Sequence, residues 1–503
     1  MRRPVVAAGV GAVALWRTRA SRERAATVAA APAHVAPTLA VLPFADRSPE
    51  ADKEYFSDGI TEELIATLAR VEGLRVASRT SAFAFKGKAI DVRTVAAQLG
   101  VATVLEGSVR RAGDRVRVTA QLVSATDGYQ LWAETYDRPA GDAFAIEQEI
   151  AQAIAQVLRV RLVGTAGTAG AAEGAAPGAE AYDLYLRGRH ALYLRGRYAW
   201  YRRTEEGLRS AARYFEQAVA QAPDYARAHA GLADAYAVMG FYDYMRPTEA
   251  FPRSVAAARR AAELDPTLGG PRATIAYALL YHDWDFARAE EEFRRALELE
   301  PNYSTGHQWY ANLLTAVGRF DEAQREMARA EELDPLSLIA KAAQGWVLHH
   351  AGDDAAALEK LRQTLELDAD YSIGLLWKGW SLEALDSLDA AVVAHRRAVA
   401  LTDSSGLFVA SLARSLALAG ERAEAESLLA RLVARDGGHR YVPSYEVAKV
   451  HEALGRRDEA LRWLERAFAE RSHSMVFLRV DPQLARLRPD PRFQRLVRQV
   501  FGA

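Results

Sequence analysis

The chain has 503 residues, a formal net charge of -1, no cysteine and 50% hydrophobic residues. This composition is that of a globular protein, and the length suggests about three domains. The near-zero charge argues against nucleic acid as the main partner, because phosphate binding requires clustered Lys and Arg. The absence of cysteine excludes disulfides, thiolate zinc sites and cysteine nucleophiles.

The sequence begins with a short apolar segment between arginines. Arg2 and Arg3 precede the thirteen apolar residues 4–16, and more arginines follow. A helix of that length falls short of the roughly 30 Å hydrocarbon core of a bilayer. Three interpretations remain open: a short signal-anchor, a cleaved secretion signal, and a leader that spans nothing. Residues 1–37 are therefore interpreted as this leader and a linker rich in Ala and Pro.

Residues 38–163 carry the pattern of a small α/β domain. A strand at 38–44 precedes a helix that Asp58 is expected to cap, with Glu62 and Glu63 in its first turn. Apolar residues alternate with polar ones from 115 to 122, which is typical of a half-buried strand. The remaining predicted elements are strands at 74–78, 103–110 and 129–135 and helices at 92–99 and 143–162. This order predicts a mixed sheet covered by helices.

The same part of the chain resembles a bacterial family. LAVLPF (39–44), residues 55–76 and residues 79–138 are similar to the TolB-like amino-terminal domain, and residues 476–497 are similar to the tail of those proteins. The resemblance implies a signalling protein with a membrane segment before this domain and a tetratricopeptide array after it. An effector (a serine/threonine kinase, a winged-helix domain or an adenylate cyclase domain) stands ahead of them. Since no effector precedes residues 4–16 here, the resemblance implies the sensor or scaffold half alone.

The sequence lacks the motifs of common catalytic and nucleotide-binding sites. It contains no G-x-x-x-x-G-K-[ST], no H-R-D, no D-F-G, no G-x-S-x-G and no H-E-x-x-H. His451-Glu452 is the one His-Glu pair, and it lacks the second histidine of a zinc motif. We therefore expect a protein that is not an enzyme, with no catalytic residues and no cofactor.

Four arginines lie on the predicted hairpin near residue 113: Arg110, Arg111, Arg115 and Arg117. One interpretation is a patch that binds an anionic partner. The other is a charged sheet edge that prevents strands of other molecules from pairing with it, and this is the interpretation we favour.

A Gly/Ala-rich linker (164–179) leads into a repeat array that we place at residues 180–472. In the unit 304–335, Gly318 ends one predicted helix and Pro335 follows a second, while small residues recur where the two helices must approach. Pro301 and Pro335 are 34 residues apart, and the period continues for about eight units. This pattern resembles the tetratricopeptide repeat. The aromatic and Arg-rich opening (181–203) is interpreted as a capping helix or, alternatively, a docking surface.

The resemblance to tetratricopeptide repeats implies that the first helix of each unit lines a concave groove. Its register assigns the following residues to that groove: Thr274, Tyr281, His282, Gln308, Asn312, Thr315, Trp346, His349, Leu376, Trp380, Glu383, Arg414, Tyr445 and Lys449. We expect an extended peptide or a helix to bind there, with Trp346 and Trp380 as anchors. Packing between helices is the alternative role of each tryptophan. The adjacent His349 and His350 face different directions on a helix, so no metal site is expected.

The tail (473–503) contains Asp481-Pro482 and Asp490-Pro491, and each pair is a start signal for a short helix. Apolar residues of this tail are expected to cap the last repeat: Leu484, Leu487, Phe493, Leu496 and Val500.

The sequence therefore predicts a small α/β domain followed by an all-α solenoid of helical hairpins. The favoured function is a non-enzymatic protein-interaction scaffold of the bacterial cell envelope, with protein as partner and no nucleic acid or metal. It would be anchored in the inner membrane through residues 4–16 or be periplasmic, with the cytoplasm as the alternative. The alternative function is the sensory half of a signalling protein that controls a separate kinase, cyclase or transcription factor.

Overall fold

The computed structural model describes residues 37–49, 54–88, 90–113, 115–139, 143–158, 161–162, 184–185, 205–402, 405–434 and 441–502. The leader (1–36), the linker 164–179 and nearly all of the segment 181–203 lie outside these residues, together with the predictions made for them. None of the helices in the described ranges combines the length and the hydrophobicity that a membrane-spanning segment requires.

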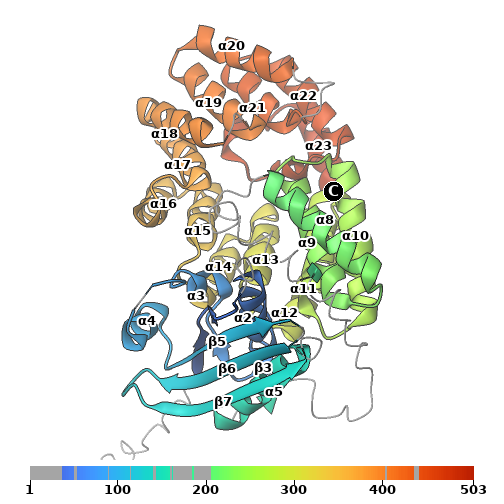
Figure 1. Ribbon diagram of the computed structural model, residues 1–503. Helices are drawn as coiled ribbons and strands as arrows, with labels where there is room; N and C mark the ends of the chain where they lie inside the picture. The colour runs from blue at the N-terminus through green and yellow to red at the C-terminus, as the bar shows by residue number, and fades with distance from the viewer. Residues whose placement is uncertain are drawn as a thin grey trace, which may run out of the picture. The chain divides into compact units, whose positions relative to one another are not determined.

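The amino-terminal domain contains the predicted mixed sheet (Figure 1). Its strands are β1 (Thr38–Val41), β2 (Ala45–Asp46), β4 (Arg75–Val76), β5 (Thr103–Ala112), β6 (Arg115–Ser124) and β7 (Gln130–Pro139). The strand order is β4-β1-β5-β6-β7, with β2 also paired to β5. Strand β1 is parallel to β4 and β5, whereas β5, β6 and β7 form an antiparallel meander. A separate short ladder joins β3 (Val71–Glu72) to β8 (Arg161–Leu162).

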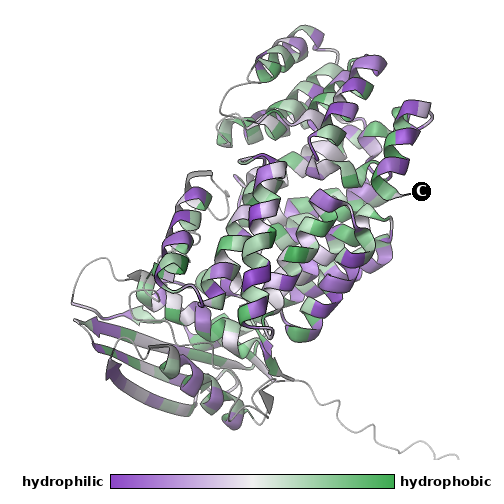
Figure 2. Cartoon of the chain, turned by 90° about the vertical axis from the view of Figure 1, so that its right-hand side faces the viewer, coloured by the Kyte–Doolittle hydropathy of each residue, from purple (hydrophilic) through white to green (hydrophobic). Residues whose placement is uncertain are grey.

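Helices cover both faces of this sheet. Helices α2 (Glu54–Leu68) and α5 (Ala143–Val157) pack on the face that buries Val116, Val118, Ala120 and Leu122 of β6, as the alternating pattern predicted. Helices α3 (Arg79–Phe83) and α4 (Val92–Leu99) come between β4 and β5, and α4 packs with Ala40 of β1. Since Ala40 and its neighbours Leu39 and Val41 point to opposite faces, α4 covers the other side of the sheet. Figure 2 shows the resulting alternation of hydrophilic and hydrophobic residues along the strands.

The predicted start of α2 was wrong. Asp58 does not cap the helix but lies inside it, where its carboxylate forms an ion pair with Lys86. Glu62 and Glu63 are likewise past the first turn: Glu62 pairs with Arg79, and Glu63 pairs with Arg227 of the repeat array. These three carboxylates are buried, so their positions are determined by partners distant in sequence rather than by the helix dipole.

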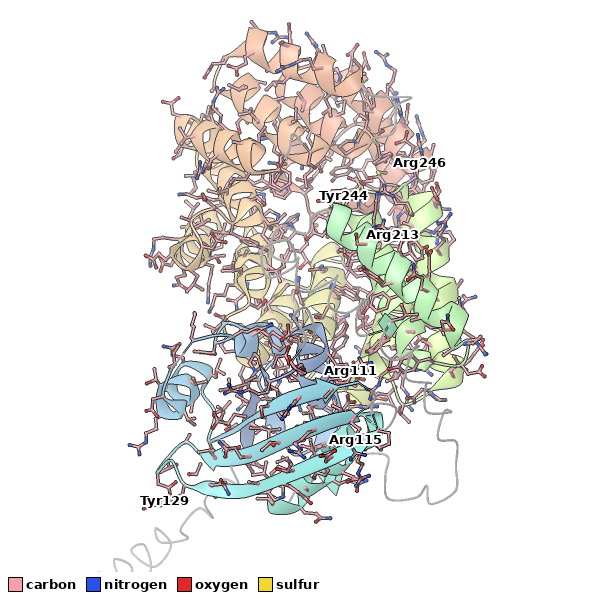
Figure 3. The ribbon with its side chains drawn as sticks, in the orientation of Figure 1. Arg111, Arg115, Tyr129, Arg213, Tyr244 and Arg246 are labelled. Carbon is pink, nitrogen blue, oxygen red and sulfur yellow. The ribbon has the colours of Figure 1, made fainter. Side chains whose placement is uncertain are left out.

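The interpretation of the arginine hairpin as a sheet edge was also wrong, because β6 lies between β5 and β7. The Nη2 atoms of Arg115 and Arg117 lie 2.6 Å and 2.5 Å from the two carboxylate oxygens of Asp137 on β7. The guanidinium of Arg111 lies 4.8 Å from the ring centre of Phe56. Figure 3 shows Arg111 and Arg115 near the same end of their strands, with Tyr129 at the far end of the meander. The strand order ends at β4 on one side and at β7 on the other, and among the described strands β7 pairs with β6 alone.

The rest of the chain is the predicted array of helical hairpins. After α8 (Glu205–Gln221), the helices pair as α9 (Ala226–Phe241) with α10 (Pro247–Leu264), α11 (Gly269–Ala278) with α12 (Phe286–Leu299), α13 (Ser304–Ala316) with α14 (Phe320–Leu333), α15 (Leu338–Ala351) with α16 (Asp354–Leu367), α17 (Ser372–Ala384) with α18 (Leu388–Leu401), α19 (Gly406–Leu418) with α20 (Arg422–Val433), and α21 (Ser444–Ala453) with α22 (Arg457–Ala469). The two helices of a hairpin approach closely at Gly345, where a Cβ would lie 2.7 Å from Leu361 Cγ. The predicted fold class is confirmed.

One repeat departs from a regular helical hairpin. Helix α11 continues into a π-helical turn, η2 (Leu279–Asp283), which ends at Trp284 with a φ of 61°. A π turn inserts a residue relative to the α-helical register and therefore changes the direction in which Tyr281 and His282 point. In the preceding repeat, α9 and α10 are joined by the segment 242–246.

The tail forms two 3-10 helices, η3 (His473–Phe477) and η4 (Pro482–Leu487), and the helix α23 (Pro491–Phe501). As predicted, the carboxylates of Asp481 and Asp490 accept hydrogen bonds from the amides of Gln483 and Arg492 and so cap the two helices that follow. The apolar residues predicted for the cap are all buried.

The tail also contacts repeats that are distant in sequence. The rings of Phe501 in α23 and Phe286 in α12 stack with centroids 4.9 Å apart. Nη1 of Arg471 donates a hydrogen bond to the carbonyl oxygen of His282 at 3.3 Å. The end of the array is therefore packed against η2 and α12.

Candidate functional site

The first helices of several repeats line one cavity of about 90 Å³. Their side chains come from α9, η2, α13, α15, α17 and α21, and η3 of the tail supplies His473, Ser474 and Phe477. Ten of the 24 lining residues are Phe, Tyr or Trp, including Trp309, Trp346, Trp377 and Trp380. We refer to this space as the aromatic cavity and to the repeat residues that line it as the wall.

Nine of the fourteen residues predicted for the groove lie together in this wall. They are Tyr281, Gln308, Asn312, Trp346, His349, Leu376, Trp380, Tyr445 and Lys449. All nine are buried, and His473, Ser474, Phe477 and Asp481 of the tail line the cavity together with them. The tail therefore occupies part of the predicted groove.

Three predicted residues lie outside the cavity. The Thr274 hydroxyl donates to Asp234 Oδ1 at 2.7 Å, and the Thr315 hydroxyl donates to the Ala311 carbonyl oxygen at 2.8 Å. His282 lies in the π turn, with its Nδ1 2.9 Å from Asp283 Oδ1. Each of these polar groups is satisfied within its own or the adjacent repeat, which is why these positions do not face the concave side.

Glu383 and Arg414 are also outside the cavity and pair with each other. Glu383 further accepts hydrogen bonds from Ser415 Oγ at 2.5 Å and from Gln483 Nε2 at 2.9 Å. Gln483 belongs to the tail. The pair Glu383 and Arg414, which was predicted for the groove, is therefore also a contact site of the tail. Next to this cluster, Arg486 Nε lies 2.7 Å from Glu452 Oε1.

The tail binds the wall through an aromatic residue and an acidic residue. The ring of Phe477 meets the ring of Trp346 edge-on, with centroids 5.1 Å apart, and also contacts His350 and Tyr281. Four residues later, Asp481 Oδ2 accepts a hydrogen bond from the Tyr445 hydroxyl at 3.0 Å. No local pattern in the sequence predicts either contact, because the partners lie more than 30 residues away.

Lys449 is the cation at the centre of this contact. Its Nζ lies 2.7 Å from Glu446 Oε2, 3.9 Å from Asp481 Oδ2 and 4.4 Å from the ring centre of Trp380. Burial alone would raise the pKa of the Asp481 carboxyl, but Lys449 and His350 outweigh it and lower that pKa. For Glu446 the effect of burial is larger than that of Lys449, so its pKa is raised.

Trp346 and Trp380 pack between helices, which was the alternative role considered for them, and both also line the cavity. Trp380 Nε1 donates a hydrogen bond to Ser411 Oγ of the next repeat at 3.2 Å. Trp346 packs its ring against those of His350 and Trp377, with centroids 4.4 Å and 6.1 Å away.

The two adjacent histidines have different environments. His349 Nδ1 lies 2.6 Å from Asp354 Oδ1, and its Nε2 has no hydrogen-bond partner among the described residues. His350 Nδ1 lies 2.9 Å from the Trp346 carbonyl oxygen. Burial, followed by the neighbouring His349, lowers the pKa of His350 to about 4, so this ring is neutral near pH 7. The described part of the chain contains no cluster of side chains suited to hold a metal ion.

Two segments of the chain match known family models. Residues 35–156 match the family model of the second domain of HilA/YgeH-like transcriptional regulators. Residues 280–346, which contain much of the wall, match the tetratricopeptide repeat. The helical array is therefore a tetratricopeptide repeat array, a protein-interaction fold. The TolB-like resemblance of the first domain stays a prediction.

Two curated relatives match part of the chain. A protein named putative adenylate cyclase 3 of Rhizobium meliloti (strain 1021) is 47% identical over 155 residues, 31% of this chain and 26% of that protein. Human tetratricopeptide repeat protein 13 is 28% identical over 108 residues, 22% of this chain and 12% of that protein. The chain thus spans about a quarter of the first relative and about an eighth of the second.

Among solved structures, the PilF protein of Pseudomonas aeruginosa is similar to part of the chain. The two share 20% identity over 41% of this chain and 92% of that one, with a TM-score of 0.32.

Proposed function

We propose that the chain is a non-enzymatic protein-interaction scaffold whose wall holds a short peptide segment. The observation that carries this proposal is the tail itself. Phe477 and Asp481 occupy the wall through Trp346, Tyr445 and Lys449, as a bound peptide would. A wall that holds one such segment has the chemistry to hold another of the same kind.

The contacts define the peptide that would compete with the tail. It carries an aromatic residue that packs on Trp346 and, four residues later, an acidic residue that reaches Tyr445 and Lys449. Buried aromatic residues contribute most of the binding energy in such interfaces. The acidic residue adds selectivity, because a basic residue there would face Lys449 without a counter-charge.

The test uses the tail as its own probe. A labelled synthetic peptide of residues 471–489 is titrated into the wild-type protein and into the full-length double variant Phe477→Ala/Asp481→Ala. We expect the double variant to bind at least about tenfold more tightly, because its own tail no longer competes. A peptide carrying Phe477→Ala should lose about 30-fold in affinity. A peptide carrying Ala485→Ser, at an exposed residue, is the matched control and should bind unchanged.

Two results would contradict the scaffold function. One is a double variant that keeps its helical circular dichroism but fails to bind the peptide. The other is equal binding of the peptides with and without Phe477. In the first case the wall would be a structural core with no capacity for exchange. Location at the cell envelope, through residues 4–16, is a separate part of this proposal.

The relative named as an adenylate cyclase favours a second candidate function. In that case the chain is the sensory or regulatory half of a signalling protein, as the 47% identity over 155 residues suggests. A test is to exchange the matched region of the Rhizobium relative for that of this chain and to measure cyclic AMP production. Regulated production in the chimera supports this function, whereas production that is unchanged when the region is deleted argues against it.

A further inference from the structure

The contact between the tail and the repeats continues past Asp481 to a second charged residue. The Nε atom of Arg486 in η4 lies 2.7 Å from Oε1 of Glu452. Glu452 follows Tyr445 and Lys449 on α21. Residues three, four and seven positions apart lie on one face of a helix, so Glu452 extends the face of α21 that meets Asp481.

The two members of this ion pair differ in exposure. The Arg486 side chain is 67% exposed, whereas the Glu452 side chain is 3% exposed. Removing the cation from a buried carboxylate is strongly unfavourable, but an exposed arginine is hydrated with or without its partner. The carboxylate is therefore the fixed part of the contact, and the arginine is the part that another molecule can replace.

The negative charge at this position exceeds the positive charge that the repeats bring to it. Among the described repeat residues, Arg414 is the one arginine or lysine that pairs with Glu383 or Glu452, and its Nη2 is 3.8 Å from Glu452 Oε2. His395 lies 3.9 Å from Glu383, but burial lowers its pKa below the ordinary 6.5, so it adds no charge near pH 7. Burial raises the pKa of Glu452, although Arg414 and Arg486 both oppose this shift. The two carboxylates thus need a second cation.

Glu452 also has an acceptor atom that no hydrogen bond uses. Its Oε2 is buried and accepts no hydrogen bond from the described residues, since 3.8 Å is too long for one from Arg414. A planar guanidinium can donate to both oxygens of a carboxylate, whereas the ammonium of a lysine is a single point charge. The position therefore favours arginine over lysine.

We propose that Glu452 is a subsite that selects an arginine in the peptide held by the wall. The partner would carry an aromatic residue, an acidic residue four positions later and an arginine five positions after that, as Phe477, Asp481 and Arg486 do. This inference rests on the proposed peptide-binding function and adds a basic determinant to the aromatic and acidic ones.

The test measures how strongly Arg486 of the peptide and Glu452 of the protein depend on each other. The labelled peptide 471–489 and its Arg486→Gln form are titrated into the full-length host Phe477→Ala/Asp481→Ala/Arg486→Ala, whose own tail lacks the three determinants. We expect the Gln peptide to bind about tenfold more weakly, and an Arg486→Lys peptide to fall between the two. In a host that also carries Glu452→Gln, the native and Gln peptides should differ by less than about twofold.

Two matched controls separate this subsite from general charge attraction. The host substitution Glu459→Gln changes a side chain of α22 that is 41% exposed and pairs with Arg462 on the same helix, so it should leave the preference for the native peptide unchanged. The peptide substitution Arg479→Gln removes the same charge from a residue that packs on Phe501 instead of Glu452. It should weaken binding by less than about threefold.

Failure of this subsite can be told apart from failure of the peptide-binding function. Equal binding of the native and Gln peptides, in a host that still discriminates against Phe477→Ala, would overturn the subsite alone. A preference for the native peptide that survives in Glu452→Gln would do the same, whereas no binding of the native peptide to the folded host would overturn both. If Glu452→Gln does not fold, equal losses from Arg486→Gln and Arg479→Gln in the peptide would still overturn the subsite.

Discussion

The ammonium nitrogen of Lys449 lies 4.4 Å from the ring centre of Trp380, although the two residues belong to different repeats. The same nitrogen is 3.9 Å from the Asp481 carboxylate of the tail. One buried cation thus connects α17, α21 and the tail. A charge left without a partner in this buried position would strongly destabilise the folded protein. Removing one member of the contact is therefore a sensitive test of the structure.

Replacing Lys449 with Met should destabilise the protein by about 3–5 kcal/mol, because Glu446 and Asp481 would remain buried without their cation. The measurement is urea unfolding of the full-length protein at pH 7. Lys378→Met in α17 is the matched control, since Lys378 forms no ion pair with the described residues, and it should change stability by less than about 0.5 kcal/mol. Equal effects of the two substitutions would refute the role of Lys449.

His350 should make the protein less stable in acid. Its pKa is about 4 in the folded protein and 6.5 ordinarily, so the unfolded chain takes up the proton more readily. The stability contributed by the neutral ring is present above pH 6.5 and is lost as the pH falls toward 4. Compared with His350→Gln, the wild type should lose about 3 kcal/mol between pH 7 and pH 4. The measurement is the free energy of unfolding in urea as a function of pH. If it changes equally with pH in the wild type and in His350→Gln, His350 is not responsible for the loss of stability in acid.

Gly379 should not tolerate even a methyl group. A Cβ there would lie 2.2 Å from Nε2 of His395, whose ring is fixed by Ser415 Oγ at 2.6 Å and by the Leu376 carbonyl oxygen at 3.0 Å. Gly379→Ala gains about 1 kcal/mol of helix propensity, but we expect overpacking to reverse the sign and cost about 2 kcal/mol net.

The matched control is Gly270→Ala, where nothing lies within 4 Å of the added carbon. This change should be neutral or stabilising by up to about 1 kcal/mol. Thermal unfolding of both variants gives the comparison. A stabilised Gly379→Ala variant would mean that α17 and α18 are not in close contact at this point.

Phe477→Ala should loosen the tail more than the rest of the protein. Losing a buried phenylalanine costs about 3–5 kcal/mol, and here the lost contacts are those with Trp346, His350 and Tyr281. Hydrogen exchange should therefore speed up in η3 and η4 and stay slow in β5 and β6. Ala485→Ser, at an exposed residue of η4, should leave exchange unchanged. Uniform acceleration across the chain would contradict a separable tail contact.

The fold could be predicted from the sequence because its signals are local. The 34-residue spacing of Pro301 and Pro335, and Gly318 at the end of a predicted helix, reflect contacts between consecutive helices. The tail contact could not be predicted, since Gln483 and Glu383 are 100 residues apart and neither has a pattern that points to the other. The prediction that Asp58 caps α2 was wrong for the same reason. Asp58 forms an ion pair with Lys86, which is distant in sequence, and it lies inside the helix although its position suggested a cap.

The stacking of Phe501 on Phe286 has a consequence for how this protein can evolve. Open arrays gain and lose repeats easily, because each unit meets only its neighbours. Here an added or deleted unit would separate two rings that must meet across several repeats. The number of repeats is therefore under a geometric constraint, and we expect gene duplication within this array to be rare among homologues that retain both aromatic residues.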